Sequence, residues 1–324
     1  MDPYTISQRN AFVTHAIDRD HARRLDDGWL SQALVAPETR FVVIWHDMVL
    51  VHTDEPKLSR LRPSQVAGPD ALRSGDGAET VLLGLLDGVT YFGTCLADAC
   101  DPTSAGLDRF GEFLDLRSVA TLMGAEEGAL AVQAKALLHW RRQHRFCGHC
   151  GAPTRIEEAG YVSRCTGETC GQLSFPRVDP AIIVLVTSGE RCLLGRQPHW
   201  PEGRYSNIAG FVEPGESLET AVAREVYEET GVGIRSLAYH SSQPWPFPQS
   251  LMVGFTAQAA TQEIQLTDGE LEDAKWLTRE EIRDGLTAGA MGLPSAYSIS
   301  FHLIEDWFDA GTCGALGALP STAW

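Results

Sequence analysis

Short apolar runs alternate with polar stretches through the first 125 residues, a pattern that predicts strands. The predicted strands cover residues 41–45, 48–51, 80–86 and 89–95. Residues 63–79 are polar and rich in Gly and Pro, so we expect a loop there. Residues 115–123 and 126–146 have the apolar spacing of helices. We therefore expect strands followed by helices in this part of the chain.

A second set of elements begins at about Pro176. Residues 181–187 and 191–196 are apolar and flank the turn Ser188-Gly189-Glu190, which predicts a hairpin. Strands are expected further on at 204–213, 234–240 and 251–259, and helices at 218–230, 278–287 and 296–309. Together the two sets of elements predict an α+β protein.

The helix expected at 218–230 has clear end signals. Ser217 is a suitable N-cap, Glu219 places an acidic group in the first turn, and Gly231 stands where a left-handed C-cap is needed. The helix places Glu225, Glu228 and Glu229 on one face, because they are three and four positions apart. We therefore expect a crowded carboxylate surface on this helix.

Carboxylates at this spacing repel one another, which costs roughly 0.2–0.5 kcal/mol per pair on an exposed helix. A hard divalent cation bound through oxygen ligands reverses that repulsion. A solvated acidic face is the alternative for any Glu-rich helix. The surrounding sequence favours the cation site, because its fixed positions match a known motif.

Residues 210–232 read GFVEPGESLETAVAREVYEETGV and resemble the Nudix box at every fixed position. The match includes the aliphatic positions Val226 and Val232. The resemblance implies hydrolysis of a nucleoside diphosphate linked to another moiety, without a nucleophilic side chain. It also implies a structural framework made of Gly210, Glu216, Arg224 and Gly231.

The same resemblance assigns roles to the carboxylates. Glu225 and Glu229 would be metal ligands, and Glu228 would be either a ligand or the residue that handles the attacking water. Two or more Mg²⁺ or Mn²⁺ ions would neutralise phosphate oxygens and generate hydroxide near neutral pH. The three catalytic candidates are therefore Glu225, Glu228 and Glu229.

Residues 242–250, SQPWPFPQS, contain three prolines, at positions 244, 246 and 248. The prolines restrict the backbone, so the aromatic rings between them are held at low entropic cost. The segment resembles the signature of the NADH pyrophosphatase subfamily of Nudix hydrolases. A polyproline segment that binds a partner, or only packs on the core, is the alternative. The resemblance implies that the segment binds substrate through Gln243, Pro244, Trp245, Pro246, Phe247, Pro248, Gln249 and Ser250.

Four cysteines have the spacing of a structural zinc site: Cys147 and Cys150, then Cys165 and Cys170. Disulfides are the competing explanation. The chain opens with charged residues and no apolar core of a signal peptide, so we expect a reducing, cytoplasmic compartment. One zinc held by four thiolates is therefore predicted, with His149 left at the surface. A zinc ribbon in this place also resembles the same subfamily.

The formal net charge of −17 would repel long nucleic acids. We therefore expect a small phosphorylated ligand, no DNA partner, and contact with RNA only at an end bound in the pocket. A length of 324 residues is more than one domain usually has, and no stretch approaches a membrane span.

Further residues follow from the resemblance where the local match is good. Glu270, six positions before Trp276, resembles a distal metal ligand, with a surface Glu as the alternative. Ala209 would lend its backbone carbonyl to a metal. A homodimer is also implied. Three more residues would contact substrate: Phe175, Phe211 and Ser300.

The predicted organisation has three parts. An NADH-pyrophosphatase-like α/β domain covers 1–125, a helix and zinc ribbon cover 126–175, and a Nudix domain, with a mixed sheet between helices, covers 176–324. The expected activity is metal-dependent cleavage of NAD(H) into nicotinamide mononucleotide and AMP, with removal of NAD caps from RNA as a related reaction. A broader Nudix pyrophosphatase acting on ADP-ribose, FAD or dinucleoside polyphosphates is one alternative. A nucleotide-sensing or RNA-binding module is another.

Overall fold

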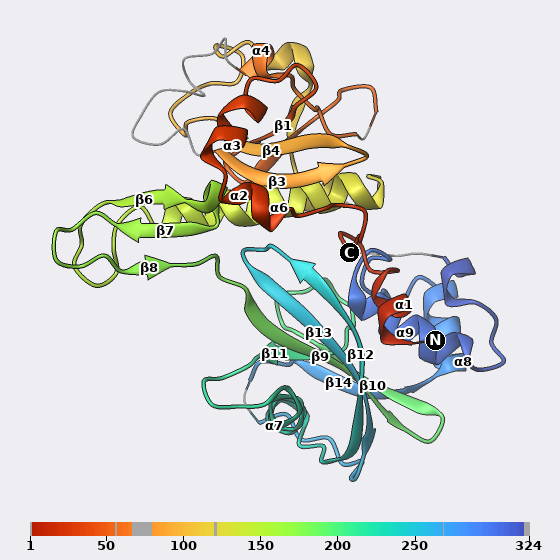
Figure 1. Ribbon diagram of the computed structural model, residues 1–324. Helices are drawn as coiled ribbons and strands as arrows, with labels where there is room; N and C mark the ends of the chain where they lie inside the picture. Colours follow the sequence, from red (N-terminus) through yellow and green to blue (C-terminus); the bar gives the residue numbers. More distant parts are fainter. Residues whose placement is uncertain (1, 56, 67–79, 120–121, 268, 321–324) are drawn as a thin grey trace. The chain divides into compact units, whose positions relative to one another are not determined.

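The computed structural model describes residues 2–55, 57–66, 80–119, 122–267 and 269–320. The chain forms two compact units, whose elements are labelled in Figure 1. Unit 1 contains Met1–Ala11, Asp179–Pro244 and Ser250–Trp324, and unit 2 contains Phe12–Val178 and Trp245–Gln249. Each unit therefore includes a short segment that is distant in sequence from the rest of it. The boundaries of the three domains expected from the sequence stay a prediction.

Unit 2 is built on a mixed sheet with the strand order β3-β4-β1-β2-β5. Strands β1 and β4 are parallel, and the other neighbours are antiparallel. The strands predicted from the apolar runs are confirmed. Their bounds are β1 Arg40–Trp45, β2 Met48–Val51, β3 Thr80–Leu86 and β4 Val89–Cys95. The edge strand β5 Glu112–Asp115 was not predicted.

The long helix α6 (Ala125–Gln143) packs against this sheet and confirms the helix expected from residue 126. Gly93 of β4 allows the close approach, because a Cβ there would lie 3.0 Å from that of Ala134. Of the expected loop 63–79, residues 63–66 form a helical turn and the rest lies outside the described residues. The short helices are α2 His21–Arg24, α3 Asp27–Ala33, α4 Pro63–Val66, α5 Leu116–Val119, and the 3₁₀ turns η2 Asp108–Phe110 and η3 Glu158–Gly160.

A small antiparallel sheet follows α6 within unit 2. It consists of β6 (Thr154–Glu157), β7 (Val162–Cys165) and β8 (Leu173–Ser174). The first cysteine pair precedes β6, and Cys165 ends β7. The strands therefore bring two cysteine-bearing turns together.

Unit 1 is built on a second mixed sheet with the order β12-β13-β9-β10-β14, in which β11 also pairs with β9. Strands β13 and β9 are parallel, and β10 pairs antiparallel with both β9 and β14. The strand bounds are β9 Asp179–Ser188, β10 Arg191–Arg196, β11 Ile208–Phe211, β12 Ile234–Trp245, β13 Ser250–Ala259 and β14 Asp273–Thr278.

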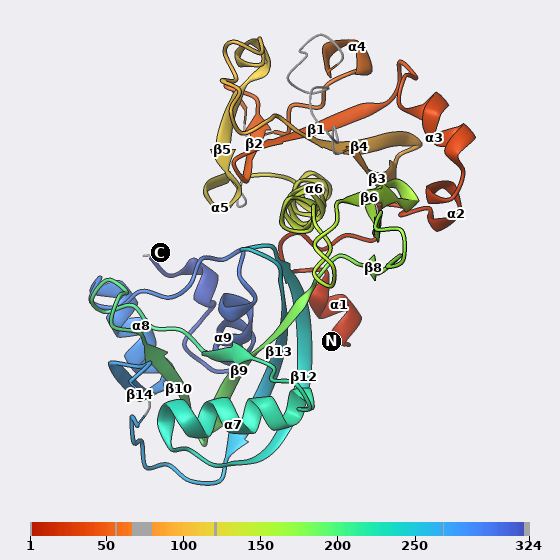
Figure 2. The same cartoon turned by 90° about the vertical axis from the view of Figure 1, so that its left-hand side faces the viewer.

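Helices cover both faces of this sheet, as Figure 2 shows. Alternating side chains of β9 explain this arrangement: Ile182 and Val184 pack with α7 (Leu218–Thr230), while Ile183 and Leu185 pack on the opposite side. That opposite side is covered by α8 Arg279–Thr287, α9 Ile299–Asp309 and the 3₁₀ turn η4 Leu316–Ala318. The expected Nudix-type sheet between helices is confirmed. Unit 1 also includes α1 (Pro3–Ser7).

The proline-rich segment is part of a hairpin. Strand β12 continues through Pro244 to Trp245, and β13 starts at Ser250. Only residues 246–249 form the turn, with a cis bond before Pro248. The first half of the proline-rich segment, residues 242–245, therefore belongs to strand β12, which the proline pattern did not predict. Among the described residues, none of the helices combines the length and apolar character needed to cross a bilayer.

Candidate functional site

Helix α7 runs from Leu218 to Thr230, as the sequence predicts. The Ser217 and Thr220 side chains form a reciprocal capping box at its start. Gly231 ends the helix with φ of 70°, a left-handed conformation that glycine adopts without strain. These local signals place the charged side chains of α7 beside the loop that precedes it.

Arg224 is the centre of this arrangement. Its Nε donates to Glu216 Oε1 at 2.6 Å, and its Nη2 donates to Glu216 Oε2 at 2.8 Å. The same Nη2 donates to the carbonyl of Phe211 at 2.9 Å. One guanidinium therefore ties the loop and the end of β11 to the helix, which is the bracing expected of this pair.

Arg224 also brings two carboxylates together. Its Nη1 donates to Glu225 Oε1 at 2.9 Å and to Glu228 Oε2 at 3.0 Å. Two acidic groups that share one donor converge on the same region of space. Glu229, next in sequence, is only 3% exposed. The structure thus brings Glu225 and Glu228 together through Arg224 and buries Glu229 on the same helix.

Glu225 lies tightly against Gly210. A Cβ at Gly210 would come within 2.4 Å of the carboxylate atoms, so only glycine leaves room for this side chain. Burial raises the pKa of Glu225, as do the negative charges of Glu228 and Glu270, although Arg224 opposes the shift. Glu270 is thus close enough for its charge to act on the cluster. Oxygen donors of this number and charge fit a hard divalent cation.

The pKa of Glu216 is lowered to about 2 because Arg224 and the backbone amide of Glu213 donate to its carboxylate. Folding therefore favours the charged form, and this stabilisation is present above the ordinary pKa of 4.5 and lost as the pH falls toward 2. Glu216→Gln should lower the melting temperature at pH 7 by no more than about 4 °C. Thermal melts between pH 7 and pH 2 should show this difference shrink below about pH 4.5. An effect that is independent of pH would contradict the assignment.

The aromatic candidates have different environments. Phe175 and Phe211 are 58% and 59% exposed, which leaves each ring open to stacking. Trp245 and Phe247 pack edge to face, with ring centroids 5.2 Å apart. The guanidinium of Arg117 lies 4.4 Å from the Phe247 centroid. The hairpin tip therefore presents a rigid aromatic pair.

Two other residues predicted to contact substrate, Gln243 and Ser300, form hydrogen bonds within unit 1. Gln243 is fully buried: its Nε2 donates to the carbonyls of Ala11 and Tyr297, and its Oε1 accepts from Ile299 N. Ser300 is also buried, with its Oγ 2.8 Å from Ser206 Oγ. In this conformation, both side chains support the site from within unit 1.

Ala209 lies in β11, where it pairs with Ile183 of β9. The structure adds a neighbour that the sequence did not suggest, Asn207, which directly precedes β11. Its Nδ2 donates to Ser300 O at 2.8 Å and to Ser300 Oγ at 2.9 Å. No sequence signal marked Asn207, because its partners are almost a hundred positions away.

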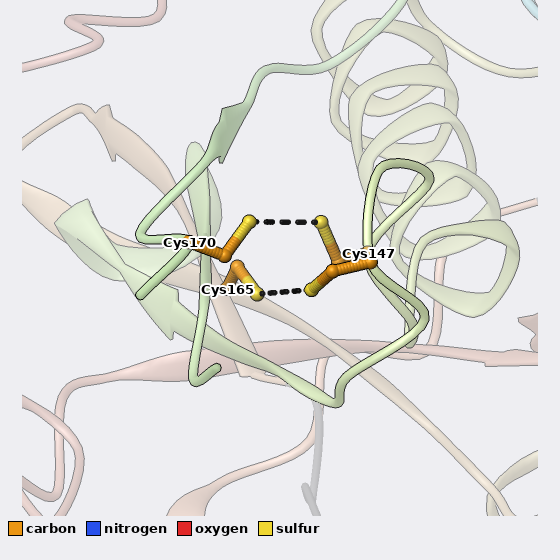
Figure 3. A group of neighbouring side chains, drawn as sticks. Cys147, Cys165 and Cys170 are labelled. Carbon is orange, nitrogen blue, oxygen red and sulfur yellow. Dashed lines mark hydrogen bonds between the residues drawn. The ribbon is translucent and has the colours of Figure 1, made fainter. Parts of the chain in front are cut away.

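The four predicted zinc ligands meet in unit 2. Their sulfurs all lie within 4.8 Å of one another. Among the described residues, the four cysteines thus form a group that could hold one metal ion. Cys147 Sγ and Cys170 Sγ are 3.8 Å apart, and Cys150 Sγ and Cys165 Sγ are 3.3 Å apart; Figure 3 shows the converging side chains. These thiols form no disulfide. Four sulfurs in this arrangement suit one tetrahedral zinc ion.

The surroundings lower the pKa of one thiol in this group and raise the pKa of another. Backbone amides of Cys150 and His149 lower the pKa of Cys147 to about 6. The Gly167 amide favours the thiolate of Cys165, but burial and the neighbouring thiols outweigh it and raise that pKa to about 12. A divalent cation resolves this conflict because it favours deprotonation of all four. His149 is exposed, as expected.

Comparison with known families matches three regions of the chain. A "NADH pyrophosphatase-like rudimentary NUDIX domain" covers residues 38–140, a "NADH pyrophosphatase zinc ribbon domain" covers 142–175, and a "NUDIX domain" covers 176–294. The ribbon and its four cysteines support a structural Zn²⁺ site.

Two similar proteins illustrate the relationship. The NAD-capped RNA hydrolase NUDT12 of Macaca fascicularis is 45% identical over 193 residues, which are 56% of this chain and 42% of that protein. The chain thus matches less than half of the length of this relative. The NAD-capped RNA hydrolase NudC of Mycobacterium bovis (strain BCG / Pasteur 1173P2) is 43% identical over 242 residues, 71% of this chain and 75% of that protein.

Proposed function

Because this chain belongs to the Nudix hydrolases that carry an NADH pyrophosphatase zinc ribbon, we propose that it cleaves the diphosphate of NAD(H) into nicotinamide mononucleotide and AMP. The observation that carries the proposal is the carboxylate cluster organised by Arg224. Removal of NAD caps from RNA is part of the same proposal, since it breaks the same bond. The names of the two relatives support this second reaction.

The proposed site uses the charged face of α7. Glu225, Glu229, Glu270 and the Ala209 carbonyl would hold Mg²⁺ or Mn²⁺ ions. Such ions, when bound, offset the charge of the diphosphate and lower the pKa of water. The side chain of Glu228 is 52% exposed, and its Oε2 accepts from Arg224 Nη1, so the carboxylate lies at the surface of the cluster. We assign to Glu228 the acceptance of a proton from the attacking water.

Recognition of the dinucleotide would depend on flat, rigid surfaces. Trp245 and Phe247 offer aromatic faces fixed by the hairpin, and the exposed rings of Phe175 and Phe211 can stack on a base. Ser300 and Gln243 would act by shaping the pocket, since their polar groups bond within unit 1. A homodimer in the cytoplasm completes the proposal.

A substrate panel tests this assignment. Hydrolysis rates would be compared for NADH, NAD⁺, NAD-capped RNA, ADP-ribose, FAD and a diadenosine polyphosphate, each with Mg²⁺ and with Mn²⁺. The proposal requires that kcat/KM is highest for NAD(H) or for NAD-capped RNA. Equal rates across the panel would instead identify a broad Nudix pyrophosphatase.

Trp245→Ala should impair NADH hydrolysis and decapping of NAD-RNA to the same degree. Loss of ring stacking costs about 1–3 kcal/mol, or roughly five- to 150-fold in kcat/KM. The shared dinucleotide explains the equal effect. Tyr4→Ala is the control, because it removes an exposed aromatic ring that lies outside the hairpin.

The body of the RNA should contribute little to binding. Of the three arginines near the ribbon that could form a basic track, Arg141 is buried and donates to Ser163 Oγ, and Arg142 pairs with Asp47 at 2.5 Å. Arg145 is exposed. Decapping of NAD-RNAs of increasing length at several salt concentrations should therefore show a shallow salt slope. If the affinity for NAD-RNA rises steeply with the length of the RNA, NAD-capped RNA would be the main substrate and free NAD(H) a secondary one.

A further inference from the structure

The first eleven residues of the chain pack within unit 1, although the rest of that unit begins at Asp179. Helix α1 is capped by Asp2, whose carboxylate accepts from the Tyr4 and Thr5 amides. Figure 1 shows this red segment beside the blue helix α9. Residues 7–11, from the last residue of α1 onward, reach strand β12. We call residues 7–11 the N-terminal strap.

The strap contacts three consecutive residues of β12. Asn10 is 2% exposed, and its Nδ2 donates to Ser241 Oγ at 3.1 Å and to Ser242 O at 2.9 Å. Ser242 N donates to Ser7 Oγ at 3.2 Å. Gln243 Nε2 donates to the carbonyl of Ala11 at 3.2 Å. These contacts end directly before Pro244 and Trp245, so they fix the strand that leads into the proline-rich turn.

Arg9 anchors the strap to α9. It donates to Glu305 and Asp306, both at 2.6 Å. Asp306 Oδ2 also lies 2.9 Å from His240 Nε2, and His240 Nδ1 lies 2.8 Å from Ser241 Oγ. A continuous set of polar contacts thus joins the strap, α9 and β12. Asn10 and His240, the buried members of this set, favour one geometry, because loss of a partner leaves a buried polar group unpaired.

The polar contacts also reach the start of α9. Gln243 donates to Tyr297 O at 2.7 Å and accepts from Ile299 N at 2.8 Å. The next residue, Ser300, accepts at its Oγ from Asn207, which directly precedes β11. The strap therefore supports the same residue, Gln243, that connects β12 to the region around Ser300.

We propose that Asn10 and Arg9 are positioning residues of the substrate site, which hold strand β12 so that the proline-rich hairpin is preorganised for a dinucleotide. This inference rests on the proposed function. The residues act through β12 and do not contact the reacting atoms. Preorganisation lowers the entropic cost of binding, so its loss raises KM more than it lowers kcat.

The test compares Asn10→Ala and Asn10→Asp with the wild type. Asp keeps the size of Asn but lacks the donor nitrogen, so both variants should raise KM for NADH about three- to tenfold, with kcat changed less than about twofold. Asp2→Ala is the matched control, because Asp2 bonds only within α1 among the contacts known for it. Ser7→Ala and Arg9→Lys are milder variants for use if an Asn10 variant fails to fold.

A general loss of folded protein would lower apparent kcat at constant KM. That result, or an unchanged KM in every strap variant, would overturn the proposal. Hydrogen exchange of the peptide containing Ser242 gives a readout that needs no substrate: exchange should be faster in Asn10→Ala than in Asp2→Ala. If the wild type does not hydrolyse NADH, the proposed function fails, while the exchange result still decides the positioning role.

Discussion

Glu228→Gln or Glu229→Gln should slow hydrolysis of NADH by at least about a hundredfold and leave the fold intact. Glutamine keeps the shape of glutamate but neither accepts a proton at neutral pH nor offers a negative charge to a cation. A positioned acid–base group contributes about 10²- to 10⁴-fold. Glu229 is buried, so the isosteric change avoids a cavity.

The measurement is kcat with saturating Mg²⁺ or Mn²⁺, with circular dichroism and melting temperature as checks on folding. Glu219→Gln is the matched control, because Glu219 lies exposed in the first turn of the same helix. Its kcat should match the wild type. Wild-type rates in excess EDTA, or full activity in both α7 variants, would exclude metal-dependent catalysis at this face.

Cys165→Ser should destabilise the protein severely, because it removes a buried ligand of the zinc site. Zinc binding in such sites is worth on the order of 10 kcal/mol or more, and three thiolates hold the ion less well than four. We expect a fall in melting temperature and in solubility before any selective change in metal-dependent catalysis.

Metal analysis of freshly purified protein should find one zinc per chain, and Cys165→Ser should contain less. Cys100→Ser is the control in the same unit, because Cys100 lies outside the sulfur cluster. It should keep its zinc and melt near the wild-type temperature. Protein without zinc, or a Cys165 variant with unchanged melting, would refute the structural role.

Local signals predicted the elements that carry the charged residues. Helix α7 has its predicted bounds because its cap residue, its first-turn acid and its terminal glycine are all adjacent in sequence. Strands β1 to β4 of unit 2 were also predicted from local sequence, since each is a continuous apolar run. The spacing of four cysteines likewise predicted their convergence.

Features that depend on distant residues could not be predicted. The motif around Gln243 predicts a substrate contact, but it does not indicate the hydrogen bonds of Gln243 with Ala11, Tyr297 and Ile299. The strand predicted at 204–213 is limited to Ile208–Phe211, because only these residues pair with β9. Propensity does not contain information about such partners.

The N-terminal strap also has a consequence for biosynthesis. Arg9 leaves the ribosome first, but its partner Asp306 is 297 positions later. At about 5–20 residues per second, translation separates the two by roughly 15 to 60 s. During this interval Arg9 lacks its partners on α9, although the β12 residues that contact Ser7 and Asn10 are made earlier. The ion pair between Arg9 and Asp306 therefore forms only after α9 has been synthesised.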